Sequence, residues 1–134
     1  MTALTEFIFP APASRSVGSI VRWWESRRLA YNAIVGTTGA FTLVVGHLIA
    51  LLPPNPPFEV VPWQIVVVYG VMANVCYTFG EVAESVLHRL FRGGLLPAGP
   101  TLWRMGLTFS VGLTLFPVLM VCFFWGLRIV SAVF

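Results

Sequence analysis

The sequence has few charged side chains and lacks two charged residue types altogether. Its 134 residues include no lysine and no aspartate, and only 10% are charged, against about 25% in an ordinary soluble domain. A small soluble protein must cover a large surface with polar groups, so the composition excludes a water-soluble globule. With only two cysteines, the chain is not a secreted disulfide scaffold either.

Hydrophobic residues are what the chain has in abundance. They make up 57% of it, and the mean hydropathy is +0.86. All eight basic residues are arginines; they flank apolar runs and form no basic stripe interleaved with aromatic residues, so we expect no nucleic-acid partner. The composition predicts an all-α integral membrane protein whose first partner is the lipid bilayer.

Three apolar segments predict a three-helix transmembrane domain over residues 29–134. The expected spans are about 29–52, 63–83 and 104–126. The first contains no formal charge over 24 residues, enough to cross a hydrocarbon core about 30 Å thick. Clusters of proline and glycine separate the spans, because neither residue sustains a helix.

Residues 1–28 are expected to form a cytoplasmic or interfacial segment. Within it, residues 16–28 carry apolar side chains at helical spacing beside several arginines. The pair Trp23-Trp24 is typical of a headgroup boundary. We therefore predict an N-terminal amphipathic helix lying on the membrane; the alternative is a bent extension of the first span.

Arginine placement predicts the orientation. Seven of the eight arginines precede the first span or lie around the turn between the second and third, and the loop between the first two spans has none. The positive-inside rule then predicts an inner-membrane, multi-pass protein with a cytoplasmic N-terminus and an external C-terminus. Four of these arginines are candidate charge partners at the inner face: Arg27, Arg28, Arg89 and Arg104.

The second span carries a polar face. With 100° of rotation per residue, six polar side chains fall on one side of the expected helix: Asn74, Tyr77, Thr78, Glu81, Glu84 and His88. Polar groups in hydrocarbon require partners, so this face is expected to meet protein or water. The glutamates could pair with the inner-face arginines, the face could contact another protein, or it could line an ion route in an oligomer.

The first span has a face of small residues that predicts close helix packing. Its members are Gly36, Gly39, Ala40, Gly46 and His47. Because three short spans bury little surface and three faces carry small or polar groups, we expect a homo-oligomer or a subunit of a larger membrane complex.

No catalytic constellation is recognisable in the sequence, so we expect no enzyme activity. The leading hypothesis is a membrane-embedded interaction or accessory subunit. In that case Asn74→Leu should weaken assembly while leaving membrane insertion intact. One alternative is a small oligomeric ion channel or transporter with a polar lane on the second span. Another is a haem- or metal-binding anchor, although His47 and His88 should lie near opposite faces, so we expect no cofactor and no metal site within one chain.

Overall fold

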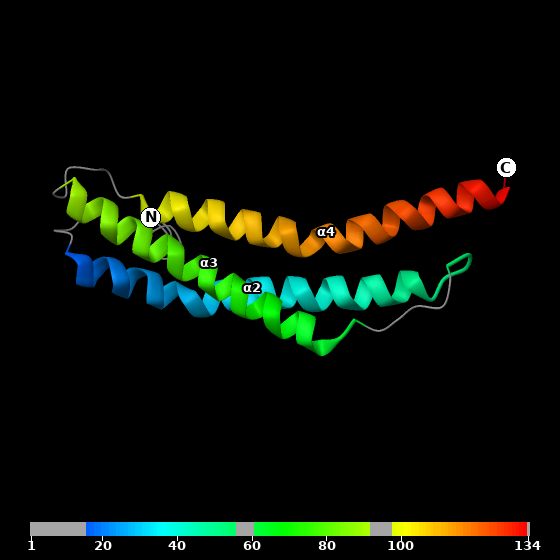
Figure 1. The fold of residues 1–134 in the computed structure, drawn as a ribbon, viewed down its shortest axis with the longest axis horizontal. Helices are drawn as coiled ribbons and strands as arrows, with labels where there is room; N and C mark the ends of the chain where they lie inside the picture. The colour runs from blue at the N-terminus through cyan, green and yellow to red at the C-terminus, as the bar shows by residue number, and fades with distance from the viewer. Residues whose placement is uncertain (1–15, 56–60, 92–97, 134) are drawn as a thin grey trace, which may run out of the picture.

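The computed structural model describes residues 16–55, 61–91 and 98–133, which form three α-helices (Figure 1). They are α2 (Val17–Ala50), α3 (Trp63–Leu90) and α4 (Gly99–Val133). Each helix is long and apolar enough to cross a membrane. The predicted all-α fold with three candidate spans is therefore confirmed. The first 15 residues of the N-terminal segment lie outside the described residues.

The helices are longer than the predicted spans. α2 has 34 residues and α4 has 35, which corresponds to about 51 Å of helix against a hydrocarbon core of about 30 Å. A capping box between Ser16 and Ser19 begins α2, because these side chains satisfy N–H groups that a helix start leaves free. α3 begins directly after Pro62, whose missing N–H costs nothing at a helix start.

The prediction of a separate amphipathic helix over residues 16–28 is wrong. α2 runs without interruption from Val17 to Ala50. Its buried residues continue at helical spacing across position 28: Ile20, Trp24, Arg27, Tyr31 and Val35. The apolar stripe interpreted as a membrane-surface face packs against the other two helices instead, because periodicity identifies a buried face without identifying what buries it.

α2 and α4 run in the same direction, and α3 runs antiparallel to both (Figure 1). The most extensive helix contact is between α2 and α4. α3 crosses α2 and then diverges from it toward its own N-terminus (Figure 1). The starts of α2 and α4 and the end of α3 therefore share one end of the molecule, which we call the polar end.

The core lies toward the polar end. A cluster of buried residues, Ile20, Trp24, Tyr31, Val35 and Tyr77, joins α2 to α3, and Leu102, Trp103 and Leu107 of α4 pack against it. Elsewhere the helices bury little surface. In the most apolar window of each helix, only 11% to 17% of the residues are buried, so most apolar side chains face outward.

Candidate functional site

A buried carboxylate joins the three helices at the polar end. Glu84 of α3 is 5% exposed. Its Oε2 accepts a hydrogen bond from Trp24 Nε1 of α2 at 2.7 Å, and its Oε1 accepts one from the backbone N–H of Gly99 at 2.9 Å. Gly99 is the first residue of α4, so Glu84 satisfies one of the N–H groups that a helix start leaves free.

The Glu84 carboxylate occupies the space that a side chain at position 99 would take, so a larger residue there would displace it. A Cβ atom there would come within 2.9 Å of Glu84 Cδ and Oε1, closer than side-chain atoms pack. Gly99 was not among the predicted site residues, because glycines and prolines before the third span are equally typical of a turn.

Aromatic rings of α2 and α3 pack together next to Trp24. The Tyr77 hydroxyl donates to the backbone oxygen of Trp24 at 2.6 Å, and the two rings meet edge to face with centroids 5.2 Å apart. Tyr31 lies on the other side of Tyr77, with centroids 4.7 Å apart. Tyr77 therefore packs within the molecule and not against lipid, and its hydroxyl has a partner as a buried polar group requires.

A group of charged side chains lies around Arg28, one helical turn after Trp24 on α2. Arg28 of α2 forms a bidentate ion pair with Glu25 and lies 3.4 Å from Glu81 of α3. Its guanidinium also donates to the Thr78 hydroxyl at 3.2 Å. Of the predicted ion pairs, the structure therefore places Arg28 against Glu81. Arg27 is buried and lies over the Trp23 ring, 4.0 Å from its centroid.

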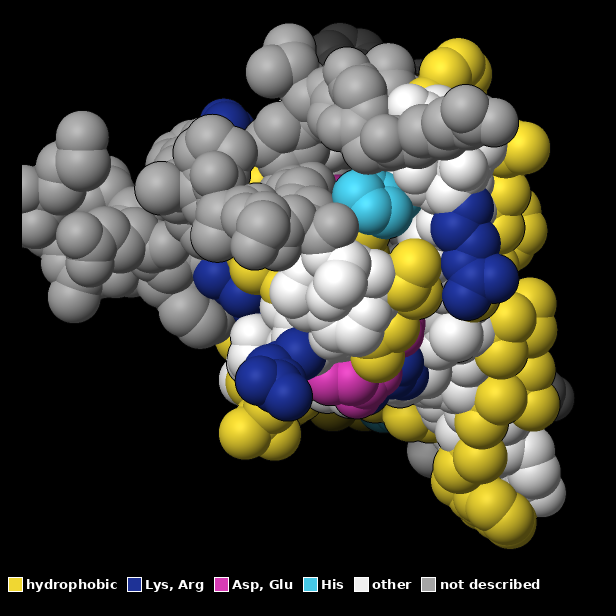
Figure 2. Space-filling model, turned by 90° about the vertical axis from the view of Figure 1, so that its left-hand side faces the viewer, with side chains coloured by type: hydrophobic (Ala, Val, Ile, Leu, Met, Phe, Trp, Pro, Cys, Tyr) yellow, Lys and Arg dark blue, Asp and Glu magenta, His cyan; other side chains and the backbone are white. Residues whose placement is uncertain are grey.

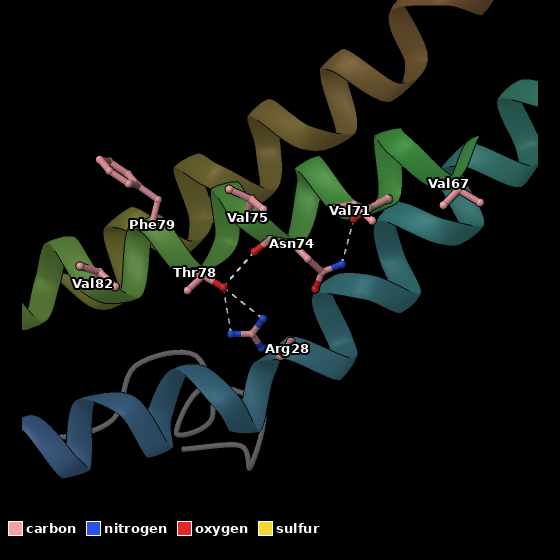
Figure 3. Close-up of a pocket in the computed structure, with 9 residues that line it drawn as sticks. Arg28, Val67, Val71, Asn74, Val75, Thr78, Phe79 and Val82 are labelled. Atoms are coloured by element: carbon pink, nitrogen blue, oxygen red, sulfur yellow. Dashed lines mark hydrogen bonds between the residues drawn. The ribbon is translucent and has the colours of Figure 1, made fainter. Parts of the chain in front are cut away.

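Asn74 forms a reciprocal amide pair with Asn32 of α2. Each side-chain nitrogen donates to the other's oxygen, at 3.0 and 3.2 Å. Asn74 also donates to the backbone oxygen of Gly70. Figure 3 shows Asn74 and Thr78 on the side of α3 that faces Arg28 and α2. An amide in hydrocarbon needs such a partner, and here the partner comes from the same chain.

α4 completes the polar core with two hydroxyl residues. Ser110 lies 2.8 Å from the Tyr31 hydroxyl, and Thr114 hydrogen-bonds the Tyr69 hydroxyl of α3. The Thr42 hydroxyl of α2 donates to the backbone oxygen of Thr114 at 2.9 Å. All three helices are thus linked by polar contacts that extend well beyond the predicted face of the second span.

The remaining predicted charges lie at the polar end. Figure 2 shows arginine, glutamate and histidine side chains together on this end, with hydrophobic side chains along the flank. His88 is half-buried, whereas Arg89 and Arg104 are exposed. His47 lies near the opposite end of the molecule, with Nδ1 2.6 Å from the Leu43 carbonyl oxygen, so the two histidines cannot share a cofactor within one chain.

The small residues of α2 fall into two groups. Gly39 faces α4, where an added Cβ would lie 3.8 Å from Thr114 Cγ2. At Gly36 and Gly46 an added Cβ would meet nothing within 4 Å, and Ala40 is exposed. Within one chain, Gly39 therefore serves helix packing, while Gly36 and Ala40 lie on an open face.

The outward face of α4 carries a pattern that the sequence analysis missed. Apolar residues recur there, separated alternately by four and three residues. This heptad pattern is typical of a contact between two helices. We call this set the α4 seam: Met105, Phe109, Gly112, Phe116, Leu119, Phe123, Gly126 and Val130. All but Gly126 are exposed. The signal was present in the recurrence of phenylalanine at 109, 116 and 123, but it is hidden in a span where almost every residue is apolar.

The contacts of these groups are hydrogen bonds, ion pairs and ring packing. Glu81, Glu84 and Asn74 of α3 contact groups of α2 or α4. Across the described ranges, no group of three or more His, Cys, Asp and Glu residues could hold a metal ion. An open groove of about 790 Å³ runs along α3, lined by apolar residues, with Arg28, Asn74 and Thr78 at its edge (Figure 3).

Comparison of the chain with family models, characterised proteins and solved structures finds no match.

Proposed function

We propose that this protein is a non-enzymatic, membrane-embedded accessory subunit that associates with further copies of itself through the α4 seam. All three helices cross the bilayer in this proposal, with the polar end at the cytoplasmic face of the inner membrane and the C-terminus outside. The single observation that carries the proposal is the exposed heptad seam on the face of α4 opposite its buried residues Thr114 and Val118.

The internal use of the polar groups supports this choice of surface. Glu84, Glu81 and Asn74 each bind partners in the same chain, so the polar face of α3 is occupied. What the molecule presents outward is apolar surface with gaps at glycine. Helices in lipid associate through close van der Waals packing at small residues, since apolar contact alone gains nothing over lipid tails.

The alternation of large and small residues supports a partner of the same kind. In a parallel pair of α4 helices, a phenylalanine such as Phe116 enters the space that Gly112 leaves on the other helix, as knobs enter holes. The seam residues are strongly exposed in one chain, with Phe109 at 70% and Phe116 at 53%. Such a contact is self-complementary and closes as a symmetric dimer.

The test is Gly112→Leu, which fills the hole. We expect dimerisation to weaken by about tenfold or more, equivalent to about 1.4 kcal/mol. Energy transfer between labelled copies in lipid vesicles, together with the mass in mild detergent, measures this.

Gly106→Leu is the matched control. Gly106 lies on the same helix but off the seam, and a Cβ there would also meet nothing within 4 Å. This variant should dimerise like the wild type. A wild-type protein that is monomeric in vesicles, or equal effects of the two substitutions, would show that the proposed function is wrong.

The two alternative functions, an ion channel and a haem or metal anchor, are less well supported by the described residues. A channel lane along α3 would require Glu81 and Glu84 to face water, yet both are buried and bonded. A haem or metal anchor would have to draw its ligands from two or more chains, since His47 and His88 lie at opposite ends. Absence of ion flux through reconstituted protein, and of a haem absorption band, is the expected result for both.

A further inference from the structure

The groove along α3 has apolar walls and a charged edge. Exposed valines of α3 line it, among them Val67, Val71 and Val75. The Arg28 guanidinium reaches the groove from α2 and donates to the Thr78 hydroxyl (Figure 3). The groove therefore combines a surface on which a hydrocarbon chain can lie with a group that can bind a polar head.

The apolar part of the groove matches the depth of one leaflet of a bilayer. From Thr78 to Val67 the helix rises about 17 Å, and half of a hydrocarbon core is about 15 Å. The lining continues past Thr78 to Val82. Arg28 directly precedes the uncharged stretch of α2, residues 29–52, so its guanidinium can extend to the lipid headgroups when the helices cross the bilayer.

The charges at this edge do not balance. Arg28 Nη2 lies 2.6 Å from Glu25 Oε1 and 3.4 Å from Glu81 Oε2. Among the described residues, these are the two carboxylates that act on Arg28. One guanidinium therefore faces two carboxylates, which leaves a negative charge uncompensated. A purely anionic headgroup would add to this excess, whereas a headgroup with a cationic part would reduce it.

Two of the three charged groups are accessible to a ligand. The side chains of Glu25 and Arg28 are 48% and 27% exposed, whereas that of Glu81 is 11% exposed. Arg28 Nη1 carries two N–H groups, and among the described residues its hydrogen bond is the one to Thr78. The edge thus offers a donor for a phosphate oxygen beside a carboxylate for an ammonium group.

We propose that the groove binds a phosphatidylethanolamine molecule from the leaflet next to the polar end. One acyl chain lies along the valines of α3, the phosphate accepts from Arg28 Nη1, and the ammonium group donates to Glu25. Hydrogen bonds between charged groups of this kind are stronger than neutral ones. The site rests on the proposed membrane placement of the helices but not on the dimer, because the groove lies on α3 and the seam lies on α4.

The lipid that the protein retains tests the site. The protein is reconstituted into vesicles with equal amounts of phosphatidylethanolamine, phosphatidylcholine and phosphatidylglycerol that carry the same acyl chains. It is then transferred into mild detergent, and native mass spectrometry counts the lipids bound to each chain. We expect about fivefold more phosphatidylethanolamine than phosphatidylcholine, whose ammonium group has no N–H, as an exposed charged contact allows. Equal retention of the three lipids, or a preference for phosphatidylglycerol, would overturn the proposal.

Glu25→Gln tests the headgroup contact. The amide keeps the size of the side chain and can still accept a hydrogen bond from Arg28, but it lacks the charge that binds the ammonium group. The preference for phosphatidylethanolamine over phosphatidylcholine should therefore be lost. An unchanged preference would mean that Glu25 does not bind the headgroup and that the proposed site is wrong.

Val71→Trp tests the groove, with Val68→Trp as its matched control. The two valines are 57% and 62% exposed on the same helix, and of the two only Val71 lines the groove. Val71→Trp places an indole in the path of the acyl chain and should reduce retention of phosphatidylethanolamine severalfold, whereas Val68→Trp should leave it unchanged. Equal losses in the two variants would place the lipid elsewhere and contradict the proposal.

Gly112→Leu separates this site from the proposed dimer. The variant should weaken dimerisation and leave the phosphatidylethanolamine retained per chain unchanged. Loss of the lipid together with the dimer would place it at the contact between chains and would overturn the site on α3. Selective retention by a protein that is monomeric in vesicles would support the site even though the proposed dimer is wrong.

Discussion

The two halves of the molecule are held together in different ways. At the polar end, the start of α2, the end of α3 and the start of α4 share a buried core in which Glu84 and Tyr77 bind groups of neighbouring helices. At the opposite end the contacts are peripheral: Trp125 Nε1 donates to the Pro53 oxygen at 3.2 Å, and Arg128 donates to the Asn55 side chain at 2.7 Å.

This difference shows where polar groups stabilise a bundle of long apolar helices. In lipid, apolar burial gives little advantage to helix association, so directed hydrogen bonds and close packing must do it. The half with the buried hydrogen bonds holds all three helices together, and in the other half α3 diverges from α2 (Figure 1). We therefore expect substitutions to lower the free energy of unfolding most at the polar end and least at the opposite end.

The largest loss should follow Glu84→Ala. It leaves Trp24 Nε1 and the Gly99 N–H buried without their acceptor, and an unsatisfied buried donor costs about 1–3 kcal/mol. Unfolding in mixed detergent micelles, followed by the loss of helical circular dichroism, measures the change.

Glu84→Gln should lower the free energy of unfolding by less than Glu84→Ala. The amide keeps one oxygen acceptor, so one of the two donors retains its partner. Equal stability of the alanine variant and the wild type would mean that the carboxylate does not hold the three helices together.

A smaller loss is expected at the crossing of α2 and α3. Replacing Asn74 by leucine removes both hydrogen bonds of the amide pair, and such bonds contribute about 0.6 kcal/mol on average between membrane helices. A double-mutant cycle with Asn32→Leu should give a coupling energy of this size.

The same variants distinguish the two uses of Asn74. The polar face of the second span predicts that Asn74→Leu weakens assembly, whereas the amide pair within the chain predicts reduced stability with dimerisation unchanged. A dimerisation loss as large as that of Gly112→Leu, without coupling to Asn32, would assign Asn74 to the contact between chains.

The smallest effect is expected at the opposite end. Arg128→Gln removes an exposed hydrogen bond to Asn55, and exposed charged contacts contribute about 0–1 kcal/mol. The free energy of unfolding should change by less than about 0.5 kcal/mol. A loss comparable to that of Glu84→Ala would erase the contrast between the two ends.

Much of the fold could be predicted from local properties. The lengths and hydropathy of the apolar segments predicted three spans, and Pro53 and Pro62 predicted where the first two are separated, because proline restricts the chain whatever its surroundings. The arc of polar residues on the second span was also predictable from helical geometry alone.

The partners of those residues were not predictable. Helical spacing shows that Ile20, Trp24 and Tyr31 share a face, but a membrane surface and a neighbouring helix would select the same pattern; hence the incorrect separate helix over residues 16–28. Likewise nothing in the sequence links Glu84 to Trp24 and Gly99, which are brought together only by the crossing of the helices.

Composition and periodicity thus determined the all-α class, the number of candidate spans and which side chains of α3 lie together, since these depend on each segment alone. The tertiary structure decided that the polar groups bind one another and that Glu84 joins three helices. These features depend on the relative register and angle of helices distant in sequence, which many low-energy packings could satisfy and only the folded chain selects.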